Sequence, residues 1–238
     1  MPGTLYGVGV GPGDPELLTL KALRVLRRVP VIAVPVTCVD GESYALSVAS
    51  AVLPPDRKVL RLVFPMVKDV AERIIHRRAA AQALADELNA DTDVVFITEG
   101  DPLLHSTFIY VLQYLPSGLA VEIVPGVSSV NAAAAEARVP LVNADQRLAV
   151  IPVAFEDVPE LDRFFTDFDT IVLLKCHHVF DQLLDLLEEH GLTENAVMVE
   201  RASHPAGRVV REVRSLRGTP IHYLSLLIVQ TKRGARVE

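Results

Sequence analysis

The chain has 238 residues, half of them hydrophobic, and a formal net charge of −7. This length allows one large domain or two smaller ones, each able to bury a core. The acidic balance argues against a nucleic-acid binder, because such proteins usually carry a basic surface. The chain enters a strand-like run without a basic leader, and no apolar run is long enough to span a bilayer. We therefore expect a cytoplasmic protein with neither a nucleic-acid partner nor a membrane partner.

Short strand-like runs recur along the whole chain. In the first half they alternate with helical patterns at 15–28 and 67–88, and a third helical pattern covers 180–189. Such alternation is typical of crossover units in a mostly parallel sheet. The predicted strands are 5–10, 29–34, 58–63, 93–98, 120–124, 148–153, 170–174, 196–199 and 222–229.

The pattern changes near the C-terminus. Strand-like segments at 197–199, 209–213 and 223–229 are separated only by short polar stretches, which favours a mixed or antiparallel sheet. Pro-Ser-Gly at 116–118 is the natural boundary. The sequence thus predicts an α/β fold with two domains: an N-terminal domain at 1–116 with a mostly parallel sheet, and a C-terminal domain at 119–238 with a mixed sheet.

The two cysteines, Cys38 and Cys176, lie far apart and lack CxxC spacing. They cannot form a metal site by themselves, and a disulfide framework is not expected. We interpret both as buried, inert thiols and predict no metal centre.

The tripeptide Gly-Asp-Pro occurs twice, at 13–15 and 100–102, each time after a strand-like run. A related junction, VPGVSS, follows at 124–129. Open α/β sheets bind small molecules where their parallel strands end. Three such turns therefore predict a ligand cleft.

The two Gly-Asp-Pro copies differ in their surroundings. Asp14 is a suitable helix N-cap and Pro15 suits the first helical position, so capping explains the first copy. In the second copy Asp101 follows a further acid, Glu99, and a hydroxyl pair comes soon after. We expect Asp101 to contact the ligand.

These turns do not suit a phosphate-bearing ligand. The third glycine of a dinucleotide fingerprint would fall on Pro12 or Asp14, and no Gly-Lys-Ser/Thr of a P-loop follows. Prolines remove N–H donors, and the acids Asp14 and Asp101 repel phosphates. A nucleotide-binding oxidoreductase is thereby disfavoured. S-adenosylmethionine, with its ribose hydroxyls, ammonium and sulfonium, suits the turns better.

Three longer motifs carry a family resemblance. They are GVGVGPGDPELLTLKA at 7–22, EGDPLLHSTF at 99–108 and VPGVSSVNAA at 124–133. Together and in this order they resemble the tetrapyrrole methylase family. The segments 64–66, 172–175 and 225–229 are similar to its precorrin-2 C20-methyltransferase subgroup.

The resemblance implies a two-domain α/β homodimer that holds S-adenosylmethionine in a cleft between the domains and releases S-adenosylhomocysteine. The cofactor-binding residues that it implies are Pro12, Glu99, Gly100, Asp101, Leu104, Ser106, Thr107, Ser128, Ser129, Lys175 and Ala202.

The sequence departs from the family pattern at His105, where the subgroup has tyrosine. His105 is the one catalytic candidate, as a substrate contact or proton acceptor; the alternative is a helix-start histidine bonded to a neighbour. The acid that relatives acting on uroporphyrinogen use as a base, after the strand at 31–35, is not evident, which argues against that reaction.

The implied activity is methyl transfer from S-adenosylmethionine to C20 of precorrin-2 or cobalt-precorrin-2 in cobalamin biosynthesis. The tetrapyrrole is then the small-molecule partner. Another tetrapyrrole C-methyltransferase, such as a uroporphyrinogen III methylase, is the alternative within the family. The acidic charge disfavours a ribose methylase of ribosomal RNA. A non-catalytic small-molecule binding module is the alternative from another class.

Overall fold

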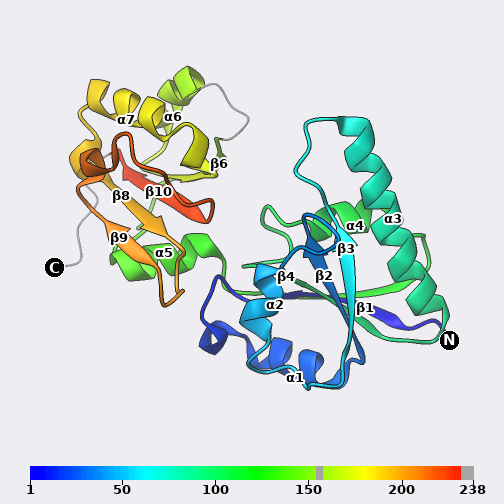
Figure 1. Cartoon of the computed structure of the whole chain (residues 1–238). Coiled ribbons are helices and arrows are strands. Elements are labelled where there is room, and N and C mark those ends of the chain that lie inside the picture. The colour runs from blue at the N-terminus through cyan, green and yellow to red at the C-terminus, as the bar shows by residue number, and fades with distance from the viewer. Residues whose placement is uncertain (154–157, 232–238) are drawn as a thin grey trace. The chain divides into compact units, whose positions relative to one another are not determined.

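The chain forms two compact α/β units, Met1–Ser128 and Ser129–Glu238 (Figure 1). The computed structural model describes residues 1–153 and 158–231. Within this part of the chain, no helix combines the length and hydrophobicity needed to cross a membrane.

The first unit is built on a five-stranded parallel sheet with the strand order β3-β2-β4-β1-β5. The central strands are almost fully buried, because helices cover both faces of the sheet. This burial explains the continuous apolar runs in the sequence. The strands are β1 (Thr4–Gly9), β2 (Val31–Val36), β3 (Lys58–Val63), β4 (Val94–Thr98) and β5 (Ala120–Val124).

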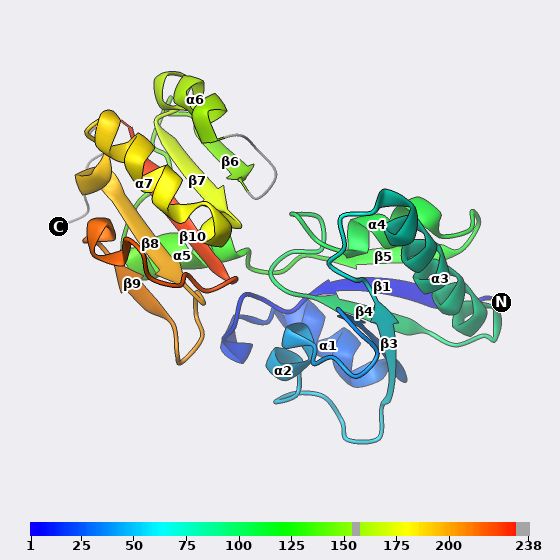
Figure 2. The same cartoon turned by 45° about the horizontal axis from the view of Figure 1, so that its top comes forward.

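Two pairs of helices enclose this sheet (Figure 2). On one face, α1 (Leu20–Arg28) and α2 (Tyr44–Ala49) contribute to a core with Val8, Ile32 and Ile97. On the other face, α3 (Val70–Asn89) and α4 (Phe108–Tyr114) pack with Leu5, Val94 and Phe96. The first unit is therefore a three-layer sandwich.

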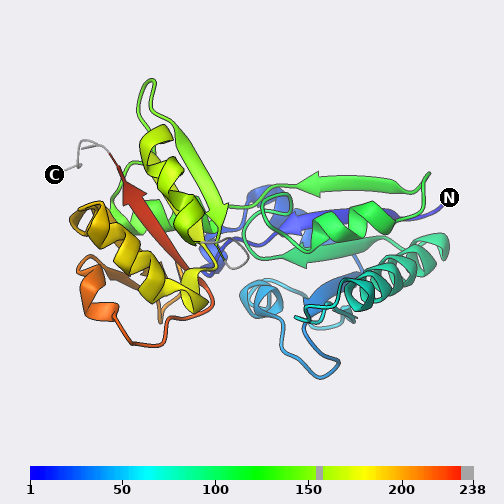
Figure 3. The same ribbon diagram turned by 90° about the horizontal axis from the view of Figure 1, so that it is seen from above.

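The second unit contains a mixed sheet with the order β6-β7-β10-β8-β9, in which only β6 and β7 pair in parallel. The helices α6 (Asp162–Asp167) and α7 (Phe180–Glu189) lie on one face, and α5 (Ser129–Ala137) contacts β8 and β10 from the other (Figure 3). The strands are β6 (Leu148–Pro152), β7 (Thr170–Leu174), β8 (Ala196–Glu200), β9 (Arg208–Val210) and β10 (Ser225–Gln230).

The predicted fold class is confirmed, with a parallel sheet in the first unit and a mixed sheet in the second. The division of the chain lies later than the expected boundary at 116–118, because β5 pairs with the free edge of β1 and so belongs to the first sheet. The expected strand at 209–213 is shorter, since Val213 begins a 3₁₀ turn (Val213–Leu216).

The expected helix at 15–28 is two separate elements. Asp14 caps a single 3₁₀ turn, Pro15–Leu17, and the chain becomes extended at Leu18, with ψ 133°. The helix α1 begins only at Leu20, where Thr19 is the N-cap and accepts a hydrogen bond from Ala22 N at 3.1 Å. Thr19 is therefore the capping residue of the long helix, and Asp14 caps only the short turn before it.

The two cysteines also differ from each other. Cys176 is buried, as expected, and burial raises the pKa of its thiol to about 12. Cys38 is exposed, so the interpretation of both as buried thiols is wrong for Cys38.

Candidate active site

Glycines from the three sequence motifs meet where β1, β4 and β5 end. A Cβ atom on Gly9 would lie 2.4 Å from Gly100 O and 2.7 Å from Gly126 N. A Cβ on Gly126 would lie 2.2 Å from the same Gly100 oxygen. Real Cβ atoms do not approach backbone so closely, so only glycine lets the three backbones pack together. We call Gly9, Gly100 and Gly126 the glycine junction.

The first and second motifs also pair through their backbones. Gly100 N donates to Gly11 O at 2.9 Å, and Gly11 N donates to Gly100 O at 3.4 Å. Gly11 has a φ of +80°, a conformation that suits glycine. Next to it, buried Pro12 accepts a hydrogen bond through its carbonyl oxygen from the hydroxyl of Tyr44 on α2, at 3.0 Å. The first turn is thus held in a defined conformation beside the glycine junction.

The capping role expected for Asp14 is confirmed: its Oδ1 accepts from Glu16 N at 2.8 Å, and Pro15 occupies the next position. The element that it caps is the short 3₁₀ turn described above, not the amphipathic helix.

Asp101 links the second motif to the third. Its Oδ1 accepts from Leu103 N at 2.9 Å, and its Oδ2 accepts from Gly126 N at 3.1 Å. Each carboxylate oxygen has a further lone pair. Asp101 therefore has a structural task and keeps the capacity to accept a hydrogen bond from a ligand.

One of the two hydroxyl residues of the second motif, Ser106, anchors the start of α4. The buried Ser106 hydroxyl lies 2.9 Å from Thr98 Oγ1 and accepts from Phe108 N at 3.1 Å. Thr107 stands at the N-cap position without a side-chain capping bond. Ser106 thus has a structural task at the start of α4, whereas the Thr107 side chain takes no part in the cap.

The loop before α4 combines backbone strain with exposed apolar side chains. Leu103 and Leu104 expose 53% and 40% of their surface. His105 adopts a φ of +54°, which is unfavourable for a non-glycine residue. Since α4 begins at Phe108, His105 lies in a strained loop and not in the first turn of a helix. Strain of this kind concentrates at functional sites.

Glu99 is the acid with the most perturbed titration in this region. Its side chain is reached by solvent, yet surrounding protein atoms desolvate the carboxylate and raise its pKa to about 7. It forms no hydrogen bond or ion pair with the residues that the structure describes. A desolvated, unpaired acid next to a backbone junction is a candidate ligand contact.

The remaining predicted residues lie at the unit division or in the second unit. Ser128 ends the first unit, and Ser129 begins α5. Lys175 follows β7 with a φ of +59°, and buried Ala202 follows β8 between two residues with positive φ. Because β7 and β8 both flank β10, Lys175 and Ala202 lie at the same edge of the second sheet. The predicted residues thus form two groups, one in each unit.

A family model described as Tetrapyrrole (Corrin/Porphyrin) Methylases matches residues 4–215. The chain belongs to this tetrapyrrole methylase family.

Named relatives span almost the whole chain. A cobalt-precorrin-2 C(20)-methyltransferase from Salmonella typhimurium is 36% identical over 230 residues, which cover 96% of this chain and 97% of the relative. A probable cobalt-precorrin-2 C(20)-methyltransferase from Methanocaldococcus jannaschii is 41% identical over 180 residues, 75% of each chain. A uroporphyrin-III C-methyl transferase from Thermus thermophilus, solved with S-adenyl homocysteine, has a TM-score of 0.67 and 27% identity, and the match covers 96% of this chain and 97% of that one.

The chemistry of the glycine junction agrees with the cofactor on which tetrapyrrole methylases depend. The prolines Pro12, Pro15 and Pro102 withhold N–H donors, so the turns are poor in donors for phosphate oxygens. Glu99 and Asp101 instead offer acceptors for hydroxyl and ammonium groups. The close backbone packing leaves no room for a side chain at Gly9 or Gly126.

Two members of the glycine junction, Gly9 and Gly126, and the supporting Tyr44 were not among the predicted site residues. Both glycines stand inside the quoted motifs, so the sequence carried a signal for them. Their mutual contact follows from strand order, which the motifs alone do not contain. For Tyr44 the sequence offered no signal, since only the fold brings α2 to Pro12.

Proposed function

We propose that this chain transfers a methyl group from S-adenosylmethionine to C20 of precorrin-2 or cobalt-precorrin-2 in cobalamin biosynthesis. The observation that carries the proposal is the 36% identity over 96% of the chain to a cobalt-precorrin-2 C(20)-methyltransferase. The glycine junction, whose three members come from three motifs of the chain, supports it.

The proposed cofactor contacts are those expected from the motifs. In the first unit they are Pro12, Glu99, Gly100, Asp101, Leu104, Ser106, Thr107 and Ser128; in the second they are Ser129, Lys175 and Ala202. When bound, S-adenosylmethionine supplies an electrophilic methyl group on its sulfonium. The carboxylates of Glu99 and Asp101 accept hydrogen bonds from hydroxyl or ammonium groups.

The chain's own contribution to the reaction is to hold and orient its ligands and to exclude water. Close backbone contacts and hydrogen bonds hold the turns of the glycine junction together, which favours alignment of the ligands. The exposed Leu103 and Leu104 provide apolar surface against which a macrocycle can pack. His105, in the same strained loop, is the proposed acceptor for the proton that leaves the methylated carbon.

The deciding experiment supplies the purified protein with S-adenosylmethionine and, in separate reactions, precorrin-2, cobalt-precorrin-2 and uroporphyrinogen III. The expected product carries one methyl group in place of hydrogen, and ¹³C-labelled cofactor places that methyl at C20 by NMR. Methylation of uroporphyrinogen III alone would instead assign the chain to the other branch of the family. Binding of S-adenosylhomocysteine without turnover of any of the three substrates would support a binding module.

We extend the proposal to a cytoplasmic homodimer, which is the assembly that the motif resemblance implies. Light scattering on the purified chain tests the assembly, and a monomer over the whole accessible concentration range would contradict it.

A further inference from the structure

One edge of the second sheet gathers most of the chain's histidines. It consists of the ends of β7 and β8 and the start of β10. In the strand register Leu174 pairs with Leu226, and Glu200 pairs with Ser225. The residues that follow β7 and β8 therefore flank the start of β10 on both sides. We call the following set the histidine-rich edge: Lys175, His177, His178, Arg201, His204, His222, Tyr223 and Ser225.

The members of the histidine-rich edge are close enough to influence one another. The ring centroids of His177 and His178 lie 3.8 Å apart, and the Tyr223 ring meets His177 edge-on at 5.1 Å. Desolvation and the charges of His178 and His222 lower the pKa of His177. Desolvation and the charge of Arg201 lower the pKa of His222, the charge of Glu200 opposes this shift, and the charge of His204 adds to it. The imidazoles and the guanidinium thus form one electrostatic cluster.

Two buried polar atoms at this edge have no hydrogen-bond partner among the described residues: His177 Nδ1 and Ser225 Oγ. Buried polar atoms in native proteins are nearly always bonded, so each orphan requires an explanation. His177 lies in the turn after β7 and Ser225 lies at the start of β10, and these two strands are neighbours in the sheet. A polar ligand that enters this edge would supply the missing partners.

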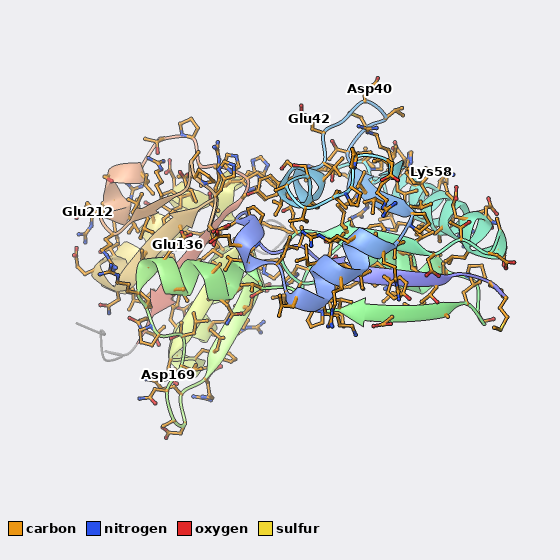
Figure 4. All side chains as sticks on the ribbon, turned by 90° about the horizontal axis from the view of Figure 1, so that it is seen from below. Asp40, Glu42, Lys58, Glu136, Asp169 and Glu212 are labelled. Atoms are coloured by element: carbon orange, nitrogen blue, oxygen red, sulfur yellow. The ribbon has the colours of Figure 1, made fainter. Side chains whose placement is uncertain are left out.

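Two cations at this edge have no ion-pair partner in the part of the chain that the structure describes. Lys175 and Arg201 form no salt bridge with any described residue. Two acids of the second unit that bond to residues around this edge are already engaged. Glu200 holds Arg208 and accepts from His222 N at 3.2 Å, and Glu136, labelled on α5 in Figure 4, accepts a hydrogen bond from Ser203 N.

The backbone here is also strained. Lys175, Arg201 and Ser203 have φ values of +59°, +49° and +63°, each in the left-handed region that non-glycine residues seldom adopt. Such strain is retained where a site requires it. The strained residues follow β7 and β8, at the same sheet edge that holds the cations of Lys175 and Arg201 and the two buried atoms without a hydrogen-bond partner.

We propose that the histidine-rich edge is the subsite that binds the carboxylate side chains of the tetrapyrrole substrate. This inference rests on the proposed function. Precorrin-2 bears several carboxylates on its ring, and cations together with imidazole N–H donors are the groups that recognise them. The backbone of Lys175 and Ala202 remains available for the cofactor, while the Lys175, Arg201 and His177 side chains serve the substrate.

The test uses the double variant Lys175→Gln/Arg201→Gln and a matched control, Arg214→Gln/Arg217→Gln. The control removes two cations from the same unit, but cations that are already paired with Asp185, Glu188 and Glu194. Uroporphyrin, a stable tetrapyrrole with eight carboxylates, is titrated by fluorescence, and S-adenosylhomocysteine by calorimetry.

The double variant is expected to bind uroporphyrin at least about tenfold more weakly than the wild type, because it has lost charge-assisted hydrogen bonds to the carboxylates. Any loss of S-adenosylhomocysteine affinity should be smaller than the loss of uroporphyrin affinity, because Lys175 is proposed to contact the cofactor through its backbone, which the substitution keeps. The control should match the wild type for both ligands. In turnover, KM for the tetrapyrrole should rise more than kcat falls. Unchanged uroporphyrin affinity overturns the proposal. So does selective loss of S-adenosylhomocysteine, which would assign these cations to the carboxylate of the cofactor.

Two measurements keep the outcome clear. If the double variant does not fold, the wild type alone decides: the imidazole ¹⁵N signals of His177 should shift on addition of uroporphyrin, and their constancy contradicts the proposal. If the wild type methylates none of the three tetrapyrroles but binds uroporphyrin through this edge, the proposed function fails while the subsite stands. If the wild type methylates a tetrapyrrole and the double variant binds and methylates it equally well, the proposed function stands while the subsite fails.

Discussion

The Asp101 carboxylate accepts a hydrogen bond from the backbone N–H of Gly126 at 3.1 Å. This bond joins the second sequence motif to the third across 25 residues of sequence. A second bond, from Leu103 N, anchors the other oxygen. Asp101 was expected to contact the ligand. The structure shows that it also stabilises the glycine junction.

Asp101→Ala should lower both stability and cofactor affinity. It leaves the N–H groups of Leu103 and Gly126 without their acceptor, so we expect a loss of about 1–3 kcal/mol in the free energy of unfolding. Thermal denaturation and titration with S-adenosylhomocysteine measure the two effects. The control is Asp14→Ala, which removes one capping bond. A destabilised Asp101→Ala protein with wild-type affinity would show that Asp101 is structural only.

Gly126→Ala should disrupt the glycine junction. The added Cβ would lie 2.2 Å from Gly100 O. This atom belongs to the backbone, so it cannot move aside as the end of a flexible side chain could. We expect a loss of roughly 3 kcal/mol, at the upper end of the usual cost of overpacking, together with loss of S-adenosylhomocysteine binding. Gly118→Asn is the control, because a Cβ there meets nothing within 4 Å and asparagine tolerates its positive φ. Equal stability of the two variants would contradict the junction.

Glu99→Gln should change the dependence of stability on pH. The pKa of Glu99 rises in the folded protein from 4.5 to about 7, so the fold favours the protonated carboxyl. The contribution of Glu99 to stability is therefore fully present below pH 4.5 and is lost as the pH rises through 7. Glutamine resembles the protonated form.

The melting temperature of Glu99→Gln should consequently match that of the wild type at acid pH and exceed it above neutrality. A series of melting curves across this range measures the difference. Glu72→Gln, the same substitution at an exposed residue of α3, is the matched control. A constant difference at every pH would contradict the raised pKa.

Ser106→Ala should weaken the start of α4. It removes the acceptor for Phe108 N and the partner of the buried Thr98 hydroxyl, so we expect a loss of about 1–2 kcal/mol. Thr107→Ala, which removes no capping bond, should cost less. Chemical denaturation of both variants gives the comparison, and equal losses would refute the role of Ser106 in anchoring α4.

Local patterns were sufficient for most elements of the fold. The strands β3, β5 and β7 have the predicted bounds, because their apolar runs are delimited by charged or turn-forming residues. The helix expected at 15–28 was wrong at its start. Asp14-Pro15 and Thr19 are both good helix starts, and local preference alone does not decide which of them begins the long helix.

The sequence by itself determined the two α/β units, the parallel and mixed sheets and the three turns that mark the site, since these depend on hydrophobic period and on the backbone properties of glycine and proline. Only the tertiary structure decided that β5 joins the first sheet and that Gly9, Gly100 and Gly126 touch. It alone also gathered His177, Arg201 and His222 at one sheet edge. The physical reason is that strand order and register bring together residues far apart in the chain, and local preferences do not specify either.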